Sequence, residues 1–592
     1  MEQVSDAFKK AIKATEREIK GYVEVIYDNQ SNESYNITEI PEQIEYGNQS
    51  EIIDGIRKVK NYASLEPDRT LLDGTFILPN SNVVGDNVGY VSNQVFSDIE
   101  NKIITIESDT PVTSSGITIY FQDNIAKDFN IKINDNVTFI ESGNTHKVYN
   151  KIFDNPIQIN KLSIEFVSME HEDWRIRIPE IDLGISQVYE GEDLVSFNTD
   201  EEIDLMMEQT PTNTCSVNLS NYENQFDPIN PTGLVKYLTD NTIIKPFCGI
   251  VTDNGIEYVC LGYYYVKDWS SDVNGNATVN GQSLMGKLSN EQIKSNGEFF
   301  DNKPWYSYDL SQYLTEMYGY KFNLDIGTIF HTDMKSYKLL EYLQALSSFM
   351  TQVEYPRKFY NSRTNEVKLD LLENYVVDTL TKTELTEDVK YETKSIVNKV
   401  SIKAINDYLL YSTGEEDVLN QQYTLVSNEE YIYFNFNKYV DPYNYQYNFS
   451  YESTSGGKAE LVDVNKHLAY IKFTGQIGET ITVHYSGYVY DDPPTYESTF
   501  TNEKNNGDKL ELDFSNYFVL SSNEIKKTAD FYLTNDKKYK ITGKYNGNPA
   551  LLTGDTVSVE TKFGMKDVIL TKLKLTFDGG LSGSFEGVGN DE

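Results

Sequence analysis

The most constraining feature of this sequence is a two-residue alternation of apolar and polar side chains in short runs. Phe129, Ile131 and Ile133 alternate with polar residues, and residues 175–178 alternate arginine with isoleucine. A period of two places successive side chains on opposite faces of a β-strand. Asn, Asp and Gly, which favour turns, separate these runs at short intervals. We therefore predict a mainly β protein, with several domains because 592 residues exceed what one core usually holds.

Helical spacing is confined to a few places. It occurs in residues 3–19 and in a middle region, where residues 311–318 end at Gly319 and residues 336–350 carry a stripe of leucines. We interpret this stripe as an ordinary core-facing helix rather than a cofactor site. The predicted parts are an N-terminal helix and strand (1–65), a sandwich or jelly roll (66–184), a first β block (185–290), an α+β middle domain (291–395), a second β block (396–410 and 500–592) and an inserted β domain (411–499).

Charge and cysteine content exclude several classes of protein. The net charge is −40, from 51 Lys and Arg against 91 Asp and Glu, so specific nucleic-acid binding, which needs cations to neutralise phosphates, is not expected. Three widely spaced cysteines without a Cys-x-x-Cys argue against a disulfide framework and a thiolate metal site. No cleaved signal is recognisable, and no apolar run reaches the roughly 20 residues that span a bilayer. The sequence predicts a protein made in a reducing cytoplasm, without a membrane span.

A search for catalytic patterns finds none that stands out. The five histidines include no HExxH pair, and neither a GxSxG elbow nor a complete phosphate-binding loop occurs. The acidic segment 190–204 lacks the spacing of a calcium loop and is better explained as a solvated surface. Among 91 acids, chance pairs are inevitable and no two are singled out as a glycosidase pair. We predict no catalytic, metal or cofactor site, and a protein that is not an enzyme.

One aromatic residue suggests a binding role. Trp174 lies beside His171 and Arg175, so an aromatic face is combined with groups that form hydrogen bonds. This combination is typical of a site that holds a sugar ring. The alternative is that Trp174 simply packs a loop onto the sandwich, and this alternative is favoured.

Several segments carry a resemblance to a known family. Residues 65–80 and 88–98, followed by 121–135 and 162–184, resemble a discoidin-like β-sandwich in tail proteins of phages and prophages of Gram-positive bacteria. Other segments resemble two domains of the baseplate-hub family, in the same order. Residues 202–233, 256–269 and 277–288 resemble its first domain, and residues 546–587 resemble its closing domain. The predicted domains that contain these segments together make up more than half of the chain.

The resemblance implies a structural protein of a virion tail. It assigns β-barrel-like hub domains to 185–290 and to 396–410 with 500–592, and implies a homotrimer at the tip or baseplate that caps the tail tube. Expected partners are copies of the chain, the tail tube and other tail proteins, with the tape-measure protein and a host cell-wall glycan as further candidates. The alternatives are a receptor-binding adhesin for a wall carbohydrate and a cell-wall hydrolase. No peptidase domain follows the hub, which argues against the hydrolase.

Overall fold

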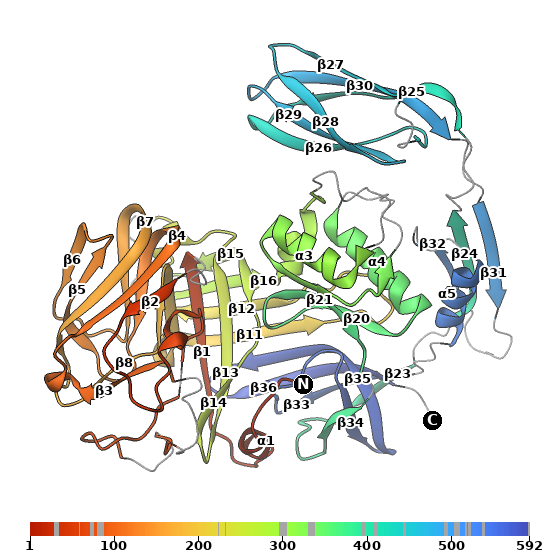
Figure 1. Cartoon of the computed structure of the whole chain (residues 1–592). Coiled ribbons are helices and arrows are strands. Elements are labelled where there is room, and N and C mark those ends of the chain that lie inside the picture. The colour runs from red at the N-terminus through yellow and green to blue at the C-terminus, as the bar shows by residue number, and fades with distance from the viewer. Residues whose placement is uncertain are drawn as a thin grey trace.

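A computed structural model gives the fold of the chain (Figure 1). It describes residues 1–592 except 29–34, 59, 71–75, 80–87, 223, 231–232, 295–304, 330–337, 374, 394–396, 406–411, 442–445, 491–494, 502–509, 516–517, 519–521, 535–538 and 590–592. The described residues form several sheets with separate cores, so the prediction of a mainly β, multidomain protein is confirmed. No helix in this described part is both long and apolar enough to cross a membrane.

A 14-stranded sheet runs through the lower part of the molecule and consists of two units (Figure 1). The first unit contains β1 (Ile19–Asp28), β10 (Ile185–Glu190), β11 (Leu194–Glu202), β12 (Thr214–Ser220), β13 (Ile243–Thr252), β14 (Gly255–Cys260), β15 (Tyr264–Ser271) and β16 (Asn276–Gln282). The second contains β22 (Val376–Leu380), β23 (Lys390–Thr393), β33 (Tyr539–Tyr545), β34 (Thr556–Thr561), β35 (Gly564–Phe577) and β36 (Leu581–Gly589). One hydrophobic core is continuous across both units and includes Phe8 and Ile12 of helix α1 (Asp6–Ile12).

A β-sandwich lies at one end of this sheet. Its larger sheet has the order β2-β4-β7-β5-β6, with β9 beside β4, and its smaller sheet pairs β3 with β8. Phe129, Ile131 and Ile133 of β5 alternate with polar residues and point into its core, as their two-residue period predicts. The strands are β2 (Asn36–Glu39), β3 (Tyr90–Val95), β4 (Ile103–Tyr120), β5 (Ala126–Ile133), β6 (Val137–Glu141), β7 (Val148–Met169), β8 (Arg175–Ile178) and β9 (Glu180–Asp182), with short helices η1 (Gln49–Ile53) and η2 (Phe96–Asp98).

The middle region combines helices with a three-stranded sheet. Helix α3 (Ser307–Tyr318) ends at Gly319, whose φ of 70° is left-handed and therefore suits glycine. The leucine stripe lies in α4 (Leu339–Val353) and is buried in the core of this region. The remaining elements are η3 (Gly191–Asp193), η4 (Leu234–Tyr237), α2 (Leu284–Lys287), η5 (Leu288–Asn290), β17 (Trp305–Tyr306), β18 (Lys321–Leu324), β19 (Thr328–Ile329), β20 (Arg357–Asn361) and β21 (Glu366–Leu371).

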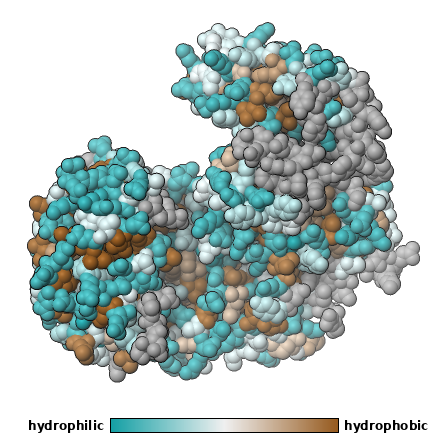
Figure 2. Space-filling view, in the orientation of Figure 1, coloured by the Kyte–Doolittle hydropathy of each residue, from teal (hydrophilic) through white to brown (hydrophobic). Residues whose placement is uncertain are grey.

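The inserted domain is a projecting lobe that overhangs the rest of the chain (Figures 1 and 2). Its two three-stranded sheets, β25-β30-β27 and β26-β29-β28, enclose a separate core. Its strands are β25 (Ser412–Thr424), β26 (Glu429–Asn435), β27 (Asn448–Ser453), β28 (Lys458–Val464), β29 (Leu468–Thr474) and β30 (Thr480–Tyr490). A small unit lies between the lobe and the large sheet and contains β24 (Val397–Ile405), β31 (Thr495–Thr501), β32 (Leu510–Ser515) and α5 (Ser522–Thr534).

The strand pairing groups several segments differently from the predicted boundaries. β22 and β23, expected in the 291–395 domain, pair with β34 and β33 of the second unit. β24, expected in the second β block, pairs with β31 and β32 and packs against α5 in a sheet separate from the 14-stranded one. The helix predicted at residues 3–19 is shorter and spans Asp6–Ile12. Alternation in a sequence identifies a strand but not its partner, and these partners are roughly 100–180 residues away along the chain, as the paired residues show.

Candidate functional site

The two units of the large sheet are joined by one pair of antiparallel strands, β11 and β35. Phe197 lies opposite Phe577, and their rings stack with centroids 5.1 Å apart. A Cβ on Gly21 would lie 2.6 Å from the Phe577 ring, so β1 can pass this ring closely because residue 21 is glycine. At the other end, Lys572 lies opposite Glu202, with Nζ 3.5 Å from a carboxylate oxygen. This junction therefore has an apolar end and a charged end.

A buried arginine holds the same junction from the side. The Arg363 guanidinium donates to the Glu201 carboxylate of β11 at 2.9 Å. It also donates to the carbonyl oxygens of Pro549 and, at 3.0 Å, of Leu551 in the second unit. Burial raises the pKa of Glu201 despite the opposing charge of Arg363. Arg363 thus connects one strand of the first unit with a loop of the second.

Each unit contains a β-hairpin with the same turn geometry. In the turn between β13 and β14, the Thr252 hydroxyl donates to the Gly255 carbonyl at 2.7 Å, and Gly255 has a φ of 97°. In the turn between β34 and β35, Thr561 donates to Gly564 at 2.7 Å, and Gly564 also has a φ of 97°. The same T-x-x-G pattern, TDNG and TKFG, is visible in the sequence. This repeat is a signal that the sequence analysis missed.

The strands that follow each hairpin also correspond. The register shifts after Val266 in β15 and after Leu570 in β35, and the residue opposite is a glycine in both, Gly281 and Gly587. Continuing across each unit, β16 pairs with β12 and then β11, while β36 pairs with β33 and then β23. β23 is therefore the counterpart of β11, and β15 is the counterpart of the second half of β35.

These counterparts differ in one respect: β11 and β35 lie together, whereas β23 and β15 lie apart. On the side away from β33, the exposed strand β23 has no paired strand within the described residues. β15 is likewise open on one side beyond Val266. There the half-buried Trp269 has an indole Nε1 without a hydrogen-bond partner, and Val273 at the following turn is fully exposed. Both edges are candidate contact surfaces.

The predicted sugar-binding residues Trp174, His171 and Arg175 lie side by side on the sandwich, but the protein's own groups occupy them. The His171 ring stacks on the indole of Trp174 with centroids 4.2 Å apart. The buried Arg69 guanidinium lies 5.6 Å from the same indole. Arg175 pairs with Glu66 at 3.0 Å. The geometry therefore fits the packing interpretation of Trp174 more readily than an open sugar platform.

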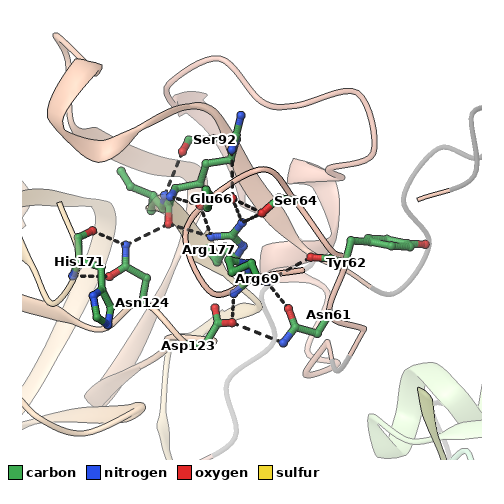
Figure 3. Close-up of polar contacts among 12 residues, drawn as sticks. Asn61, Tyr62, Ser64, Glu66, Arg69, Ser92, Asp123, Asn124, His171 and Arg177 are labelled. Atoms are coloured by element: carbon green, nitrogen blue, oxygen red, sulfur yellow. Dashed lines mark hydrogen bonds and ion pairs between the residues drawn. The ribbon is translucent and has the colours of Figure 1, made fainter. Parts of the chain in front are cut away.

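Arg69, which lies over the Trp174 ring, belongs to a network of charged side chains (Figure 3). The Glu66 carboxylate accepts from Arg177 at 2.9 Å and from the backbone N–H of Arg175 at 2.5 Å. Arg69 pairs with Asp123. Burial acts to raise the pKa of Glu66, but the hydrogen bonds and charge of Arg177, with hydrogen bonds from Ser64 and Arg175, outweigh it and lower that pKa to about 2. This network fixes the segment that contains Glu66 and Arg69 onto strand β8.

The described residues contain no group of three or more His, Cys, Asp and Glu side chains placed to hold a metal ion. Burial raises the pKa values of the thiols of Cys215, Cys248 and Cys260. A protonated thiol is a poor nucleophile and a poor metal ligand. Cys215 and Cys248 are small side chains of the shared hydrophobic core, and Cys260 is partly buried.

Comparison with known proteins gives structural similarities alone. No family model matches the sequence, and no curated protein matches it. The chain is similar to the 43 kDa tail protein of prophage MuSo2 from Shewanella oneidensis, with 10% identity, a TM-score of 0.37, and coverage of 68% of this chain and 95% of that one. It is similar to the tail protein from Neisseria meningitidis MC58, with 10% identity, a TM-score of 0.37, and coverage of 67% and 93%.

A third similar structure is prophage tail protein gp18 from Listeria monocytogenes EGD-e. It has 10% identity, a TM-score of 0.33, and coverage of 68% of this chain and 91% of that one. At these TM-scores and identities, the similarities assign no fold, activity or partner to this chain.

Proposed function

We propose that this chain is a structural hub or tail-tip protein of a bacteriophage or a phage-tail-like particle, and that it closes into a homotrimeric ring against the tail tube. The observation that carries the proposal is the repeated unit: the β11–β35 junction is used within the chain, and its counterparts β23 and β15 are both open. Pairing β23 of one copy with β15 of the next would repeat the internal junction between chains. An interface between two different surfaces closes into a ring when the rotation permits it.

The internal junction fixes the register expected between copies. Thr199 of β11 lies opposite Leu575, and by position these residues correspond to Tyr391 and Ser271. Glu392 should then lie opposite Ser270 of the next copy, and Thr393 opposite Trp269 of the next copy. This arrangement would satisfy two open strand edges, which are otherwise prone to uncontrolled pairing.

The number of copies and the location follow from the resemblance of residues 202–288 and 546–587 to the baseplate-hub family. Three copies, each with two units, would present six similar units to the tail tube. The other proposed partners are further tail or baseplate proteins, including the tape-measure protein, after assembly in the host cytoplasm. We propose no enzymatic step. Contact of a host glycan with Trp174, His171 and Arg175 stays a prediction. The His171 ring, which stacks on Trp174, already covers part of the indole that a sugar would need.

Cysteine pairing tests the proposed ring directly. Glu392→Cys combined with Ser270→Cys should give disulfide-linked dimers and trimers on mild oxidation, because directly opposite residues of antiparallel strands have Cβ atoms about 4.5–5.5 Å apart. Either substitution alone is one control. Glu392→Cys with Lys267→Cys is a second control, since three residues of strand move the thiol by about 10 Å.

Light scattering of the purified chain completes this test. A trimer is expected for the natural sequence, and Val273→Asp should shift it toward the monomer. A chain that stays monomeric at high concentration and forms no linked species with the Glu392/Ser270 pair would contradict the proposal.

A further inference from the structure

The inserted domain has an aromatic outer face that its core does not require. In β26, Ile432 and Phe434 pack into the core of the domain, so Tyr431 and Tyr433 point to the opposite side by the two-residue period. Tyr433 lies opposite Tyr470 of β29. In Figure 1, β26, β28 and β29 form the side of this domain that faces α3. The aromatic face is therefore directed at the middle region rather than at open solvent on the far side.

Three of these tyrosines form a stack. The rings of Tyr433 and Tyr470 have centroids 4.3 Å apart at 21°, and those of Tyr431 and Tyr470 have centroids 5.6 Å apart at 30°. The inner end is fixed, because the buried Tyr433 donates its hydroxyl hydrogen to the Ile293 carbonyl of the middle region. The outer end is open, since Tyr431 is 40% exposed. Tyr431 is therefore the exposed member of the stack.

Charged side chains hold the outer ring in position. Lys472 lies opposite Tyr431, and its Nζ is 5.3 Å from the centre of the Tyr431 ring. The same Nζ pairs with Glu429 at 2.9 Å. Glu460 lies opposite Lys472 on the next strand. Polar groups therefore flank the aromatic platform on the same face of the sheet.

A cavity of about 900 Å³ lies against this face. One wall contains Tyr431, Tyr470, Lys472 and Glu460, and the other is formed by residues 290–294 with Met317. This volume lies within the range of small-molecule sites, about 300–1,000 Å³. The walls combine an aromatic surface with amide, carboxylate and ammonium groups, so the cavity can form both stacking contacts and hydrogen bonds.

The charges that line the cavity indicate the class of ligand. Two lysines, Lys294 and Lys472, are balanced by two glutamates, Glu291 and Glu460, while Asn290 and Gln292 add neutral donors and acceptors. An anionic ligand would need an excess of cations, and the whole chain has a net charge of −40. A greasy ligand would leave these polar groups without partners, which costs free energy. A neutral ligand with many hydroxyls and an apolar ring face satisfies both requirements.

We propose that this cavity binds a neutral oligosaccharide, with a sugar ring against Tyr431 and its hydroxyls hydrogen-bonded to Glu460, Lys472 and the amides of Asn290 and Gln292. The apolar C–H face of a pyranose matches an exposed tyrosine ring, and its hydroxyls match the polar walls. The site is separate from Trp174 and does not depend on the proposed ring. In an oligomer, several such sites would raise the avidity for a repetitive surface polymer.

The test uses the full-length chain on a printed array of neutral and acidic oligosaccharides. At least one neutral oligosaccharide should bind, and Tyr431→Ala should reduce that binding 10-fold or more. Tyr431→Trp should retain it, because a larger ring preserves the platform. Tyr451→Ala is the matched control: Tyr451 is also 40% exposed but lies in β27 of the other sheet, so binding should be unchanged.

Three results would overturn the proposal: no neutral oligosaccharide binds, acidic oligosaccharides alone bind, or Tyr431→Ala binds as well as Tyr451→Ala. The proposal would also be overturned if a protein partner bound at this face and no sugar competed with it. The Val273→Asp variant separates this proposal from the ring, since it should assemble poorly and still bind the neutral sugar at each site.

Discussion

The two units of the large sheet have corresponding strands, yet their edges have different fates. β11 of the first unit lies against β35 of the second, with Phe197 and Phe577 stacked at the contact. Its counterpart β23 is exposed, and β15, the counterpart of β35, ends beside the fully exposed Val273. The comparison shows that the same type of strand edge can be paired within the chain, at β11 and β35, and unpaired elsewhere, at β23 and β15. It also indicates which residues belong to the joint alone.

The largest loss of stability is expected on replacing Arg363, which holds the junction between β11 and the second unit. Arg363→Ala should lower the free energy of unfolding by about 3–5 kcal/mol, because it leaves Glu201 buried without its partner. Hydrogen exchange of peptides from β11 and β35 measures this loss. Lys368→Ala is the control: Lys368 lies on β21 nearby, and its ion pairs with Glu366 and Asp370 are partly exposed and long, so the change should be within about 0.5 kcal/mol.

Matched substitutions at the two edges separate stability from assembly. Phe577→Ala should destabilise the chain by about 3 kcal/mol, because it removes a buried ring and leaves a cavity beside Phe197. Val273→Ala should change stability by less than about 0.5 kcal/mol, since its side chain is fully exposed in the single chain. Urea unfolding and light scattering, measured on both variants, check this contrast. If Val273→Ala unfolds as easily as Phe577→Ala, the two edges do not differ as described.

The sequence predicted two β-rich blocks but not how they meet, and it placed β22 and β23 in the middle domain rather than in the second unit. Local alternation and the T-x-x-G turns are visible in the sequence, whereas the pairing of Val376 with Thr556 joins residues far apart. Arg363 carried no sequence signal, because its partners Glu201 and Leu551 lie 162 and 188 residues away. A buried ion pair across such distances depends on the assembled fold.

The candidate sugar sites teach a related lesson. Trp174, His171 and Arg175 were singled out because they are neighbours in the sequence, and they are neighbours in the fold as well. Proximity did not reveal that His171 would stack on the indole. The partly exposed ring of Tyr431 depends instead on the pairing of β26 with β29, which places Lys472 opposite Tyr431 and Tyr470 opposite Tyr433. Whether an aromatic ring is exposed depends on the strands paired beside it, and this pairing cannot be read from a short stretch of sequence.

Acid should destabilise the sandwich segment that contains Glu66 but not, through Glu201, the junction between the two units. The pKa of Glu66 is lowered to about 2 in the fold, so its stabilisation is complete above its unfolded value near 4.5 and is lost as the pH falls toward 2. Burial raises the pKa of Glu201, so the folded joint binds this proton more readily than the unfolded chain does, and acid costs it nothing through this group. By pH 3, the sandwich should lose about 2 kcal/mol through Glu66.

Hydrogen exchange at pH 5 and pH 3, corrected for the intrinsic rate, measures both regions in one sample. Peptides from β3 and β8 should lose protection on acidification, while peptides from β11 and β35 should keep theirs with respect to Glu201. Glu66→Gln should already be destabilised at pH 5, since the amide cannot pair with Arg177 as a carboxylate does, and should lose its extra response to acid. Equal loss of protection in both regions, or an unchanged response in Glu66→Gln, would show that Glu66 does not set the acid sensitivity of the sandwich.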